Sequence, residues 1–409
     1  MYDVLQGMRA VEGSSFIAAP LCGLYLTQLG AEVIRFDQIG GGPDYHRWPL
    51  APGTDASLYW EGLNAGKKSI AIDLHKPEGR ELAQRLVTAP GQGGGLFVTN
   101  YPLDGFLAHQ RLAALRPDLI TVRVMGQANG LPALDYTVNC ALGIPQITGP
   151  ADLGERPVNH VLPAWDLLTG AYAAFALLAA ERRRGQSGQG QEVRVPLADL
   201  GVSSVATLGM LAEALASGAA RARYGNDVFG AFGRDFLTAD RQRIMVMAMT
   251  PRQWRGLLEA LELRTEVAQI EQECGVSFER DEGLRFKFRE RLIPAVASAI
   301  AARTLATLQP LFDRLGVCWS PYLTTLEAAR DPALVGQNPI FSRIRQHSGL
   351  SYPVSGAPAT LPHAERHAPR RAPGLGEHTE EVLAQVLNLS SGEIGRLHDA
   401  AVVAGPLRP

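Results

Sequence analysis

The chain has 409 residues, of which 46% are hydrophobic and 20% are charged, a composition typical of a globular protein with a large core. Its 39 lysine and arginine residues nearly balance its 41 aspartate and glutamate residues, which argues against non-specific nucleic-acid binding because such binding needs a positive excess. No window holds 18 uninterrupted apolar residues, so we expect no membrane-spanning helix.

The four cysteines lie far apart and form no CxxC pair, so the sequence indicates neither a disulfide framework nor a zinc site. The first residues lack the basic start and the apolar stretch of a secretory signal. No HExxH, GxSxG or P-loop motif is present. We therefore expect a cytoplasmic protein that uses no metal.

The first half of the chain alternates strand-like and helix-like segments. β-forming runs predict strands at residues 8–14, 32–37, 68–74, 95–101, 119–126 and 192–199. Helical apolar spacing predicts helices at residues 18–31, 76–89, 110–118 and 167–184. This alternation predicts an α/β domain with a Rossmann-like, mainly parallel sheet and helices on both faces. Ligands of such sheets bind at the carboxyl ends of the strands, which are expected at Ser14–Phe16, Asp37–Gly42, Asn100–Tyr101 and Gly126–Gly130.

The chain changes character after residue 200. A glycine- and aromatic-rich stretch at 225–236 breaks the α/β pattern, and a strand at 243–249 precedes mainly helical sequence. These features predict a second, smaller α+β domain. We expect a large α/β domain over residues 1–200, a linker helix over 201–224, the small domain over 225–330, and a return segment over 331–409 that completes the large domain.

Asp166 is a lone acid just before the long apolar helix predicted at residues 167–184. The simplest interpretation is a helix N-cap, because an Asp there accepts hydrogen bonds from the first backbone N–H groups. The helix dipole is also expected to keep a carboxylate at this place ionised. An ionised, oriented carboxylate can attack an activated acyl group and form a covalent intermediate. The position is compatible with both roles.

Three other stretches have both a structural and a functional interpretation. The turn at 13–20 is either an ordinary strand-to-helix connection or a place where backbone N–H groups face a ligand. Lys67 and Lys68 form either a solvated pair or a phosphate site, which Arg35, Arg47 and Arg123 would join. The stretch 225–236 is either a domain-crossing loop or a backbone segment that closes over a reacting centre.

Five stretches in chain order resemble the class III CoA-transferase family, the group of formyl-CoA and carnitine-CoA transferases. They are AAPLCGLYLTQLGAEVIRFD, NAGKKSIAIDLHKPEGRELAQRLV, VTNYP, DLLTGAYAAFALLAAERRRGQSGQGQEVRVPLAD and APGLGEHTEEVL. Each stretch alone is weakly specific, but five in the family's order cover nearly the whole chain. The resemblance implies an interlocked homodimer that acts on an acyl-CoA and needs no cofactor beyond the coenzyme A of its substrate.

The resemblance also implies roles for individual residues. Asp166 takes the place of the family's catalytic aspartate, which attacks the thioester carbonyl of the acyl-CoA. The family's flexible glycine loop, thought to cover the reacting centre, corresponds to Phe229, Gly230, Ala231, Phe232 and Gly233. CoA-binding positions correspond to Phe16, Ile17, Ala18, Gln38, Lys67, Lys68, Asn100, Tyr101 and Met125. The acyl pocket corresponds to Asp135, Asn139 and Trp165.

Some residues depart from the family's patterns. Racemases of the family carry a His-Asp pair where this chain has Leu134 and Asp135, so two-base proton transfer lacks a partner. Asn139 replaces a glutamine that is common in the transferases. Gln38 and Met125 stand where basic residues occur in other members. The absence of a His beside Asp135 disfavours a racemase, and the other departures concern the acyl and nucleotide contacts.

The stretches VEGSSFIAAPL, VIRFDQIGGGPDYHRWP, DYTVN, NHVLPAWD and YGNDVFGAFGRDF resemble family members that move CoA between the C1 and C4 carboxylates of one mesaconate. Such an intramolecular transfer needs a tight site, since proximity makes the second carboxylate a better acceptor than an outside acid. The side chains that we expect to narrow it are Phe16, Ile17, Trp165, Phe229 and Phe232. The alternatives are an intermolecular CoA transferase for another small dicarboxylic acid and a non-catalytic CoA-binding protein.

Overall fold

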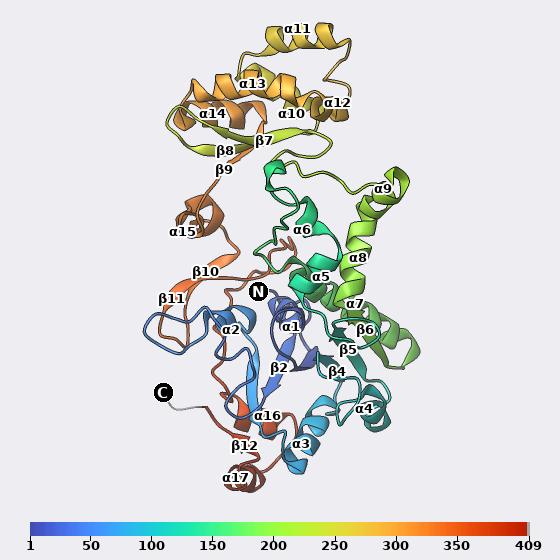
Figure 1. Ribbon diagram of the computed structural model, residues 1–409. Coiled ribbons are helices and arrows are strands. Elements are labelled where there is room, and N and C mark those ends of the chain that lie inside the picture. The colour runs from blue at the N-terminus through green and yellow to red at the C-terminus, as the bar shows by residue number, and fades with distance from the viewer. Residues whose placement is uncertain (407–409) are drawn as a thin grey trace. The chain divides into compact units, whose positions relative to one another are not determined.

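A computed structural model describes residues 1–406 (Figure 1). Spatial contacts between residues divide the chain into two compact units. The first unit comprises Met1–Leu142, Val161–Glu213 and the chain from Pro332 onward. The second unit comprises Gly143–His160 and Ala214–Asp331. The segment 143–160, which the sequence analysis left within the large domain, thus makes most of its contacts in the second unit.

The first unit is built on a seven-stranded sheet. Its strands are β1 (Arg9–Gly13), β2 (Glu32–Asp37), β3 (Lys68–Ile72), β4 (Leu96–Thr99), β5 (Ile120–Met125), β6 (Gln191–Pro196) and β12 (Val403–Ala404). The spatial order is β12-β3-β2-β1-β4-β5-β6, and every pairing is parallel except that of β12 with β3. In the centre of the sheet, Val11 pairs with Ile34 on one side and Phe97 on the other. The predicted mainly parallel α/β sheet is confirmed.

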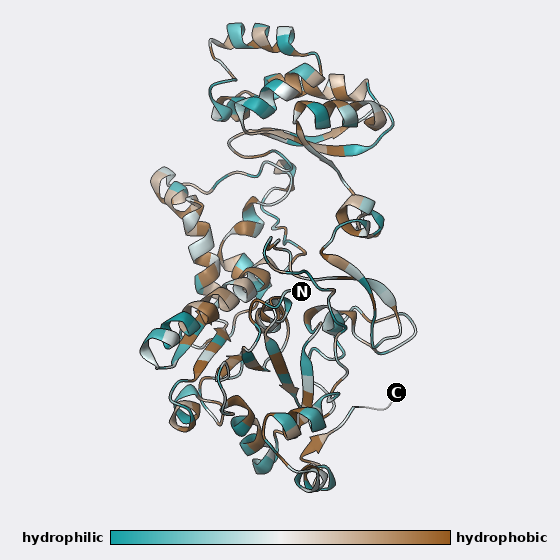
Figure 2. Ribbon diagram, turned by 180° about the vertical axis from the view of Figure 1, so that it is seen from behind, coloured by the Kyte–Doolittle hydropathy of each residue, from teal (hydrophilic) through white to brown (hydrophobic). Residues whose placement is uncertain are grey.

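Helices cover both faces of this sheet, because successive strand residues point to opposite sides. Val11 belongs to the hydrophobic cluster under α3 (Pro77–Val87) and α16 (Thr379–Gln385), whereas Ala10 belongs to the cluster under α1 and α7. The remaining helices of this unit are α1 (Ala18–Gln28), α2 (Leu58–Leu63), α4 (His109–Leu115), α5 (Asp135–Ala141), α7 (Ala164–Ser187), α8 (Leu197–Thr207) and α17 (Ser391–Asp399). Figure 2 shows that the strands of the sheet carry mainly hydrophobic residues.

Three further elements lie between α8 and α16 in the chain. Helix α9 (Met210–Ser217) spans the boundary between the units, and strands β10 (Phe341–Arg345) and β11 (Ser351–Ser355) form an antiparallel pair in the first unit. Within residues 1–406, no single helix is long and apolar enough to cross a membrane. The pair α8 and α9 passes that test by length and composition, with a bend of 66° between them.

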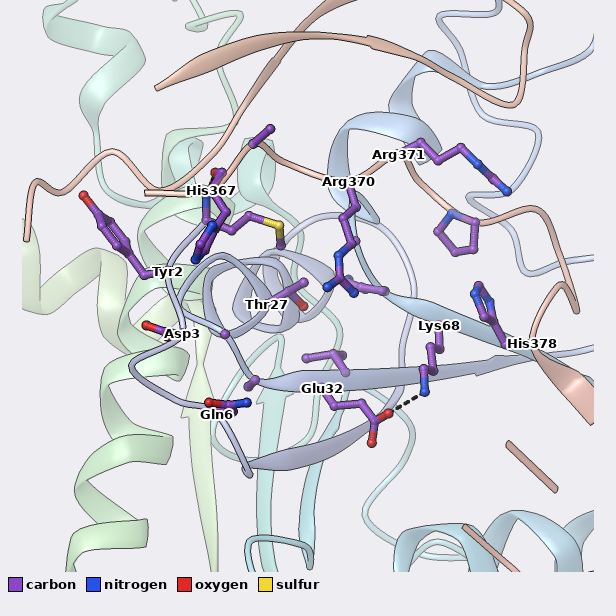
Figure 3. A pocket seen from close by; sticks show the side chains of 18 of the residues that line it. Tyr2, Asp3, Gln6, Thr27, Glu32, Lys68, His367, Arg370, Arg371 and His378 are labelled. Carbon is purple, nitrogen blue, oxygen red and sulfur yellow. Dashed lines mark hydrogen bonds and ion pairs between the residues drawn. The ribbon is translucent and has the colours of Figure 1, made fainter. Parts of the chain in front are cut away.

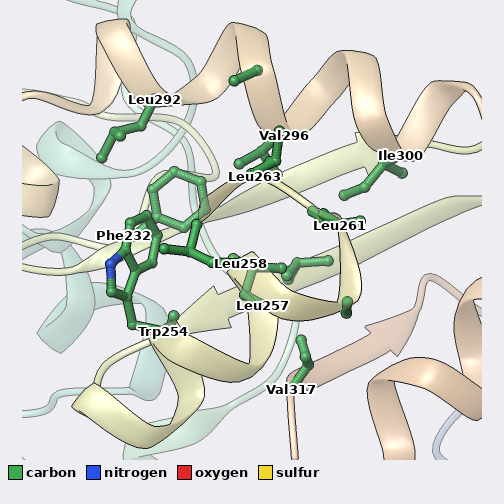
Figure 4. Packing of buried hydrophobic residues seen from close by; sticks show 14 of the residues in the cluster. Phe232, Trp254, Leu257, Leu258, Leu261, Leu263, Leu292, Val296, Ile300 and Val317 are labelled. Carbon is green, nitrogen blue, oxygen red and sulfur yellow. The ribbon is translucent and has the colours of Figure 1, made fainter. Parts of the chain in front are cut away.

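The second unit is a small α+β structure. Its antiparallel sheet has the order β7 (Phe232–Leu237), β8 (Arg243–Ala248) and β9 (Cys318–Pro321). The helices are α6 (Ile144–Ile147), α10 (Pro251–Ala260), α11 (Arg264–Cys274), α12 (Glu282–Lys287), α13 (Arg289–Ala301), α14 (Leu305–Leu315) and α15 (Thr325–Arg330). Phe232 and Trp254 lie at the centre of its core, beside Leu257 and Leu292 (Figure 4).

Candidate active site

The strand order of the large sheet reverses direction between β1 and β4. In open parallel sheets this reversal leaves a crevice at the carboxyl ends of the two strands, where ligands bind. The turn Ser14–Ile17 follows β1 there, and Asn100 and Tyr101 follow β4. The candidate site is therefore built around the turn between β1 and α1.

The turn between β1 and α1 is fixed by side chains from two other segments. The Ser15 amide donates to Asn100 Oδ1 over 3.2 Å, and Asn100 Nδ2 donates to the Ser15 carbonyl over 2.9 Å. The Phe16 amide donates to Asp44 Oδ2 over 3.1 Å. These two amides are thus used within the protein, which favours an ordinary strand-to-helix connection for this part of the turn. Asn100 holds the turn in place.

Phe16 occupies an unusual backbone conformation. Its φ of 70° lies in the left-handed region, which a bulky residue rarely adopts without external restraint. The hydrogen bonds to Asn100 and Asp44 supply that restraint on both sides of the residue. Its ring remains 40% exposed at the edge of the sheet. This conformation presents an aromatic ring, rather than backbone, at the crevice.

Asp166 lies in the first turn of α7, because the helix begins at Ala164, three residues earlier than predicted. The cap comes from elsewhere: Asp135 Oδ2, on α5, accepts from the Trp165 amide over 2.7 Å and from the Asp166 amide over 3.2 Å. The interpretation of Asp166 as the N-cap is therefore wrong. The helix end is capped by the carboxylate of Asp135, which leaves that of Asp166 for another role.

Close packing of two helices brings Asp166 to the crevice. A Cβ on Gly170 would lie only 2.7 Å from the Ala18 carbonyl and 2.8 Å from Leu21 Cβ, so α7 and the start of α1 touch at backbone distance. Asp166 precedes Gly170 by four residues and shares its helix face. The Asp166 side chain thus lies beside the first turn of α1, which begins at Ala18, two residues after Phe16.

Burial and the neighbouring carboxylate of Asp135 raise the pKa of Asp166 to about 6. The helix dipole is expected to favour the ionised form, but the pKa of this group is nevertheless raised, first by burial and then by the charge of Asp135. The carboxylate is still largely ionised at neutral pH. A less hydrated carboxylate whose pKa is close to the working pH is well suited to covalent attack.

The structure brings the three expected acyl-pocket residues together beside Asp166. Trp165 Nε1 donates to Asn139 Oδ1 over 3.2 Å, and Asn139 is fully buried on the same helix as Asp135. Asn139 Nδ2 is buried without a hydrogen-bond partner in the described structure. Asp135, Asn139 and Trp165 therefore fix the first turn of α7.

The lysines predicted to bind phosphate are already engaged by protein groups. Lys67 is 3% exposed, and its ammonium donates to Glu12 Oε2, the Pro20 carbonyl and Asn64 Oδ1 over 2.8, 2.8 and 2.9 Å. All three N–H donors are used, which leaves none for a phosphate. Its partner Glu12 is itself fully buried. Lys67 is thus a structural cation in the core.

Lys68 is the first residue of β3 and lies at the opposite edge of the sheet from the β1–α1 turn. It pairs with Glu32 and Glu381 over 2.5 and 2.8 Å. Figure 3 shows it beside Glu32 in a cavity of about 890 Å³, whose lining includes His367, Arg370 and His378. Lys68 therefore lies away from the candidate site.

Of the three arginines proposed as phosphate ligands, two are buried and paired within the protein and one is exposed. Arg35 is buried and pairs with Asp37 and Asp44 over 2.9 and 2.8 Å. Arg123 is buried and donates to the Tyr101 and Pro102 carbonyls over 2.6 and 2.8 Å. Arg47 remains exposed at the surface.

Buried charges under the turn were missed by the sequence analysis. A buried network of charges lies under the turn. Its acids are Glu12 on β1, Asp37 at the end of β2 and Asp44 in the loop after β2, and its cations are Arg35 and Lys67. A signal was present, because β1 and β2 each place charged residues within otherwise apolar runs. Such residues are seldom fully buried unless they are paired. The network holds Asp44 where it accepts the Phe16 amide.

The other expected CoA-binding residues differ in exposure. Ala18 is buried in the core, and Ile17 is partly exposed at the start of α1. Gln38 donates to Asp73 Oδ1 over 3.0 Å. Tyr101 packs against Phe36, and burial raises its pKa to about 12. Met125 is partly exposed at the end of β5.

The expected glycine loop belongs to the second unit, whereas Asp166 belongs to the first. It is a tight turn: the Ala231 amide donates to the Val228 carbonyl over 3.2 Å, with Phe229 and Gly230 at the tip. Gly230 has φ 80°, which the third position of a type II turn requires.

The members of that loop have different surroundings. Phe229 is 45% exposed and stacks on Tyr224. Phe232 is 1% exposed in the core of the unit, so it is wrong as a residue that narrows a substrate site. Ala231 is buried, and a Cβ on Gly233 would lie 2.8 Å from Met247 Cβ. Only Phe229 and Gly230 form the accessible tip.

A metal has no evident ligand set in this part of the structure. Within residues 1–406, no group of three or more His, Cys, Asp or Glu side chains is arranged to hold a metal ion.

The α/β fold and the neighbouring carboxylates of Asp135 and Asp166 are compatible with an acyl-transfer enzyme, and the sequence shows the family. A family model described as CoA-transferase family III matches residues 5–379, and the chain belongs to this family. The family resemblance inferred from the five motifs is thereby confirmed.

Among its relatives, the chain is 46% identical to 2-methylfumaryl-CoA isomerase of Chloroflexus aurantiacus over 409 residues, which cover 100% of both chains. It is 28% identical to succinyl-CoA–D-citramalate CoA-transferase of the same organism, with 98% of each chain covered. Among solved structures, a CaiB/BaiF family protein from Brucella suis is similar, with a TM-score of 0.76 and 23% identity over 94% of this chain and 100% of that one.

Proposed function

We propose that the protein moves CoA between the C1 and C4 carboxylates of mesaconate and so converts 2-methylfumaryl-CoA into 3-methylfumaryl-CoA. The observation that carries this proposal is the 46% identity, over the full length of both chains, to a 2-methylfumaryl-CoA isomerase. The resemblance of the turn, α5 and α7 sequences to that subgroup supports it further. CoA would enter at the carboxyl edge of the sheet, near Phe16, Ile17, Asn100, Tyr101 and Met125.

The first half of the reaction uses Asp166 as the nucleophile. One carboxylate oxygen attacks the C1 thioester carbonyl, the C–S bond breaks, and a mixed anhydride and the CoA thiolate result. The thiolate then attacks the aspartyl carbonyl, which breaks the anhydride C–O bond. The products are an aspartyl-CoA thioester and free mesaconate, and no proton is gained or lost.

The second half repeats these steps with the other carboxylate. The C4 carboxylate attacks the aspartyl thioester and expels the CoA thiolate, which then attacks the C4 acyl carbonyl. Asp166 is released as a carboxylate and the CoA is on C4. The released acid is a far better acceptor than a bulk acid if it stays in place, because the step is then intramolecular.

Asp135 supports this chemistry in two ways. It accepts the Trp165 and Asp166 amides, so it fixes the backbone that carries the nucleophile. Its charge also contributes to the raised pKa of Asp166, after the larger effect of burial. A carboxylate whose pKa lies near 6 is a better match for an acyl-transfer nucleophile than a fully hydrated one.

The test is incubation of the pure protein with mesaconyl-C1-CoA, without added acid, followed by chromatography that separates the C1 and C4 esters. The C4 ester is the expected product, and Asp166→Asn should form none. A second incubation includes isotope-labelled free mesaconate. Label in the product ester would replace the proposal with an intermolecular transferase, the activity named for the 28% identical relative. Absence of any turnover would overturn both.

We also propose that the protein is a homodimer. Leu168, Tyr172 and Phe175 on α7 are 42%, 48% and 65% exposed, and their spacing places them on one helix face. Leu208 and Leu215, at and beyond the end of α8, are 75% and 85% exposed. A face of this kind supports burial against a second copy, which light scattering during gel filtration would detect as twice the chain mass. A monomer at micromolar concentration would overturn this assignment.

We place the protein in the cytoplasm. Cys22 is buried as a free thiol and Cys274 is a partly buried free thiol, which supports a reducing compartment. Fractionation of the source cells would test this placement.

A further inference from the structure

A small cluster at the start of α2 lies outside the set of residues assigned above. Ser57 caps α2 by accepting the Trp60 amide over 3.0 Å, and its hydroxyl donates to the Arg47 carbonyl. The Leu58 amide donates to the Pro49 carbonyl over 2.9 Å. The loop that carries Arg47 is therefore tied to the first turn of α2, where Tyr59 lies.

Arg47 bridges two aromatic rings at this place. Its guanidinium carbon lies 5.4 Å from the ring centre of Tyr59 and 5.5 Å from that of Phe16. The side chain is exposed, and no ion pair with it occurs within residues 1–406. Arg47 is thus a cation at the same turn that presents Phe16 to the crevice.

The Tyr59 hydroxyl is the unusual member of the cluster. Its oxygen is buried and makes no well-aligned hydrogen bond in the described structure, although the Arg47 guanidinium is close enough to lower its pKa by charge and by hydrogen bonding. Burying a hydroxyl without a partner costs on the order of 1–3 kcal/mol, so such a group is explained best by a ligand that it meets. Arg47, on the adjoining loop, offers a positive charge beside it.

The Tyr59 hydroxyl also lies within the electrostatic field of the proposed nucleophile. Burial is the main cause that raises its pKa to about 12, and the charges of Asp44 and Asp166 raise it further, against the lowering effect of Arg47. The phenol is therefore protonated at neutral pH and acts as a donor. Of the two carboxylates, Asp166 is the one that we assign to the reaction.

An O–H donor beside an exposed guanidinium that forms no ion pair in the described residues is an arrangement that recognises a carboxylate. We propose that Arg47 and Tyr59 anchor the free carboxylate of a dicarboxylic acyl-CoA while Asp166 reacts with the thioester at the other end. This inference rests on the proposed function and deepens it, because it assigns the residues that retain the dicarboxylate. When the acyl group leaves Asp166, the anchor keeps the acid in the crevice for the return step.

The test is equilibrium binding by calorimetry in the Asp166→Asn protein, where no turnover disturbs the measurement. Mesaconyl-C1-CoA is compared with tiglyl-CoA, which has a methyl group in place of the free carboxylate. Adding Arg47→Met should weaken binding of mesaconyl-C1-CoA by about 10- to 100-fold and that of tiglyl-CoA by less than about 3-fold. Arg111→Met on α4, an exposed arginine of the same unit, is the matched control and should change neither.

Tyr59→Phe gives a second readout. It should weaken binding of mesaconyl-C1-CoA selectively by about 3- to 10-fold with little change in Tm, because the hydroxyl makes no well-aligned hydrogen bond within the protein. Equal loss for both esters in Arg47→Met would overturn the anchor and assign Arg47 to the CoA moiety. No loss for either ester would overturn it as well.

A further ester pair separates this inference from the proposed function. Succinyl-CoA and butyryl-CoA also differ only by carboxylate against methyl at the end of the chain. One outcome is that the unchanged protein fails to isomerise mesaconyl-C1-CoA, yet Arg47→Met binds succinyl-CoA more weakly and butyryl-CoA as before. That outcome supports the carboxylate anchor and overturns only the assignment of mesaconyl-CoA as the substrate. If neither dicarboxylic ester is selectively lost, the anchor falls by itself.

Discussion

Asp135 accepts the backbone amide of Asp166 over 3.2 Å, and it accepts the preceding Trp165 amide over 2.7 Å. One carboxylate therefore caps the helix that carries the other. The two negative charges are held close together at a helix N-terminus, whose partial positive charge favours both. The arrangement couples the position of the proposed nucleophile to its protonation.

The first prediction concerns Asp135→Asn. The amide oxygen can still accept the two backbone N–H groups, but the negative charge that raises the pKa of Asp166 is gone. Since the reaction needs ionised Asp166, kcat of the unchanged enzyme should fall as pH drops through about 6. In Asp135→Asn that acid limb should move to lower pH, while burial keeps the pKa above its ordinary value. A pH profile of kcat measures the shift.

Asp135→Ala is the companion variant. It removes both the charge and the cap, and loss of a cap costs on the order of 1–2 kcal/mol. We therefore expect a lower Tm and a lower kcat, in addition to an acid limb of the kcat–pH profile that lies at lower pH. An acid limb at the same pH in both variants would contradict the coupling of the two carboxylates.

The second prediction concerns the stability of Asp166→Asn. A carboxyl group whose pKa is raised to about 6 on folding destabilises the folded protein above that pH, where it is ionised. The penalty fades as the pH falls below about 6 and is small by about pH 4, where the folded group is protonated and the unfolded group is only partly ionised. At pH 7 to 8 the variant should be more stable by about 1–2 kcal/mol, a figure reduced for the partial exposure of the group.

Thermal unfolding at pH 8 and pH 4 checks this expectation. Tm of Asp166→Asn should exceed that of the unchanged protein at pH 8, and the two should converge at pH 4. Such a gain, in a variant without activity, is the pattern of a residue kept for reaction rather than for stability. Equal destabilisation at both pH values would instead make Asp166 a structural residue.

The sequence predicted the large sheet and the family correctly because these depend on local patterns. Alternating apolar strands and amphipathic helices fix the parallel order, as the pairing of Val11 with Ile34 and Phe97 illustrates. The start of α7 was not predictable in this way. Its cap comes from Asp135, 31 residues earlier, and only tertiary contact brings that side chain to the helix.

Charged residues were the least predictable part of the candidate site. Lys67 and Arg35 have the residue types of a phosphate site, yet both are buried among Glu12, Asp37 and Asp44. Whether a cation in a loop or strand end faces solvent or an acid depends on the neighbouring strand, which sequence spacing does not show. Nothing in the sequence predicts a role for Tyr59, because the burial of its hydroxyl without a well-aligned hydrogen bond depends on the folded surroundings.

The third prediction separates Lys67 from Lys68. Lys67→Met leaves Glu12 buried without its closest cation, so it should lower the free energy of unfolding by about 3–5 kcal/mol. Lys68→Met removes a partly exposed pair and should lower it by less than about 1 kcal/mol. Urea denaturation measures both. A Lys67→Met protein of unchanged stability but weaker CoA binding would restore the phosphate role.

The fourth prediction concerns the contact between α1 and α7. Gly170→Ala places a methyl group 2.7 Å from the Ala18 carbonyl, a backbone atom that cannot move alone. The helices must separate, which should lower stability by about 1–3 kcal/mol and kcat by more than about 10-fold, since small displacements of a reacting group are costly. Gly185→Ala in the same helix is the matched control, because no atom lies within 4 Å of its added Cβ.

Gly185→Ala should leave kcat unchanged and raise stability by about 0.5–1 kcal/mol, as alanine favours the helix over glycine. Steady-state kinetics and thermal unfolding of both variants give the comparison. The kcat loss in Gly170→Ala should persist at temperatures far below its Tm, since it comes from a displaced Asp166 and not from unfolding. Recovery of kcat at low temperature would show that the glycine serves folding alone and that the contact does not position the carboxylate.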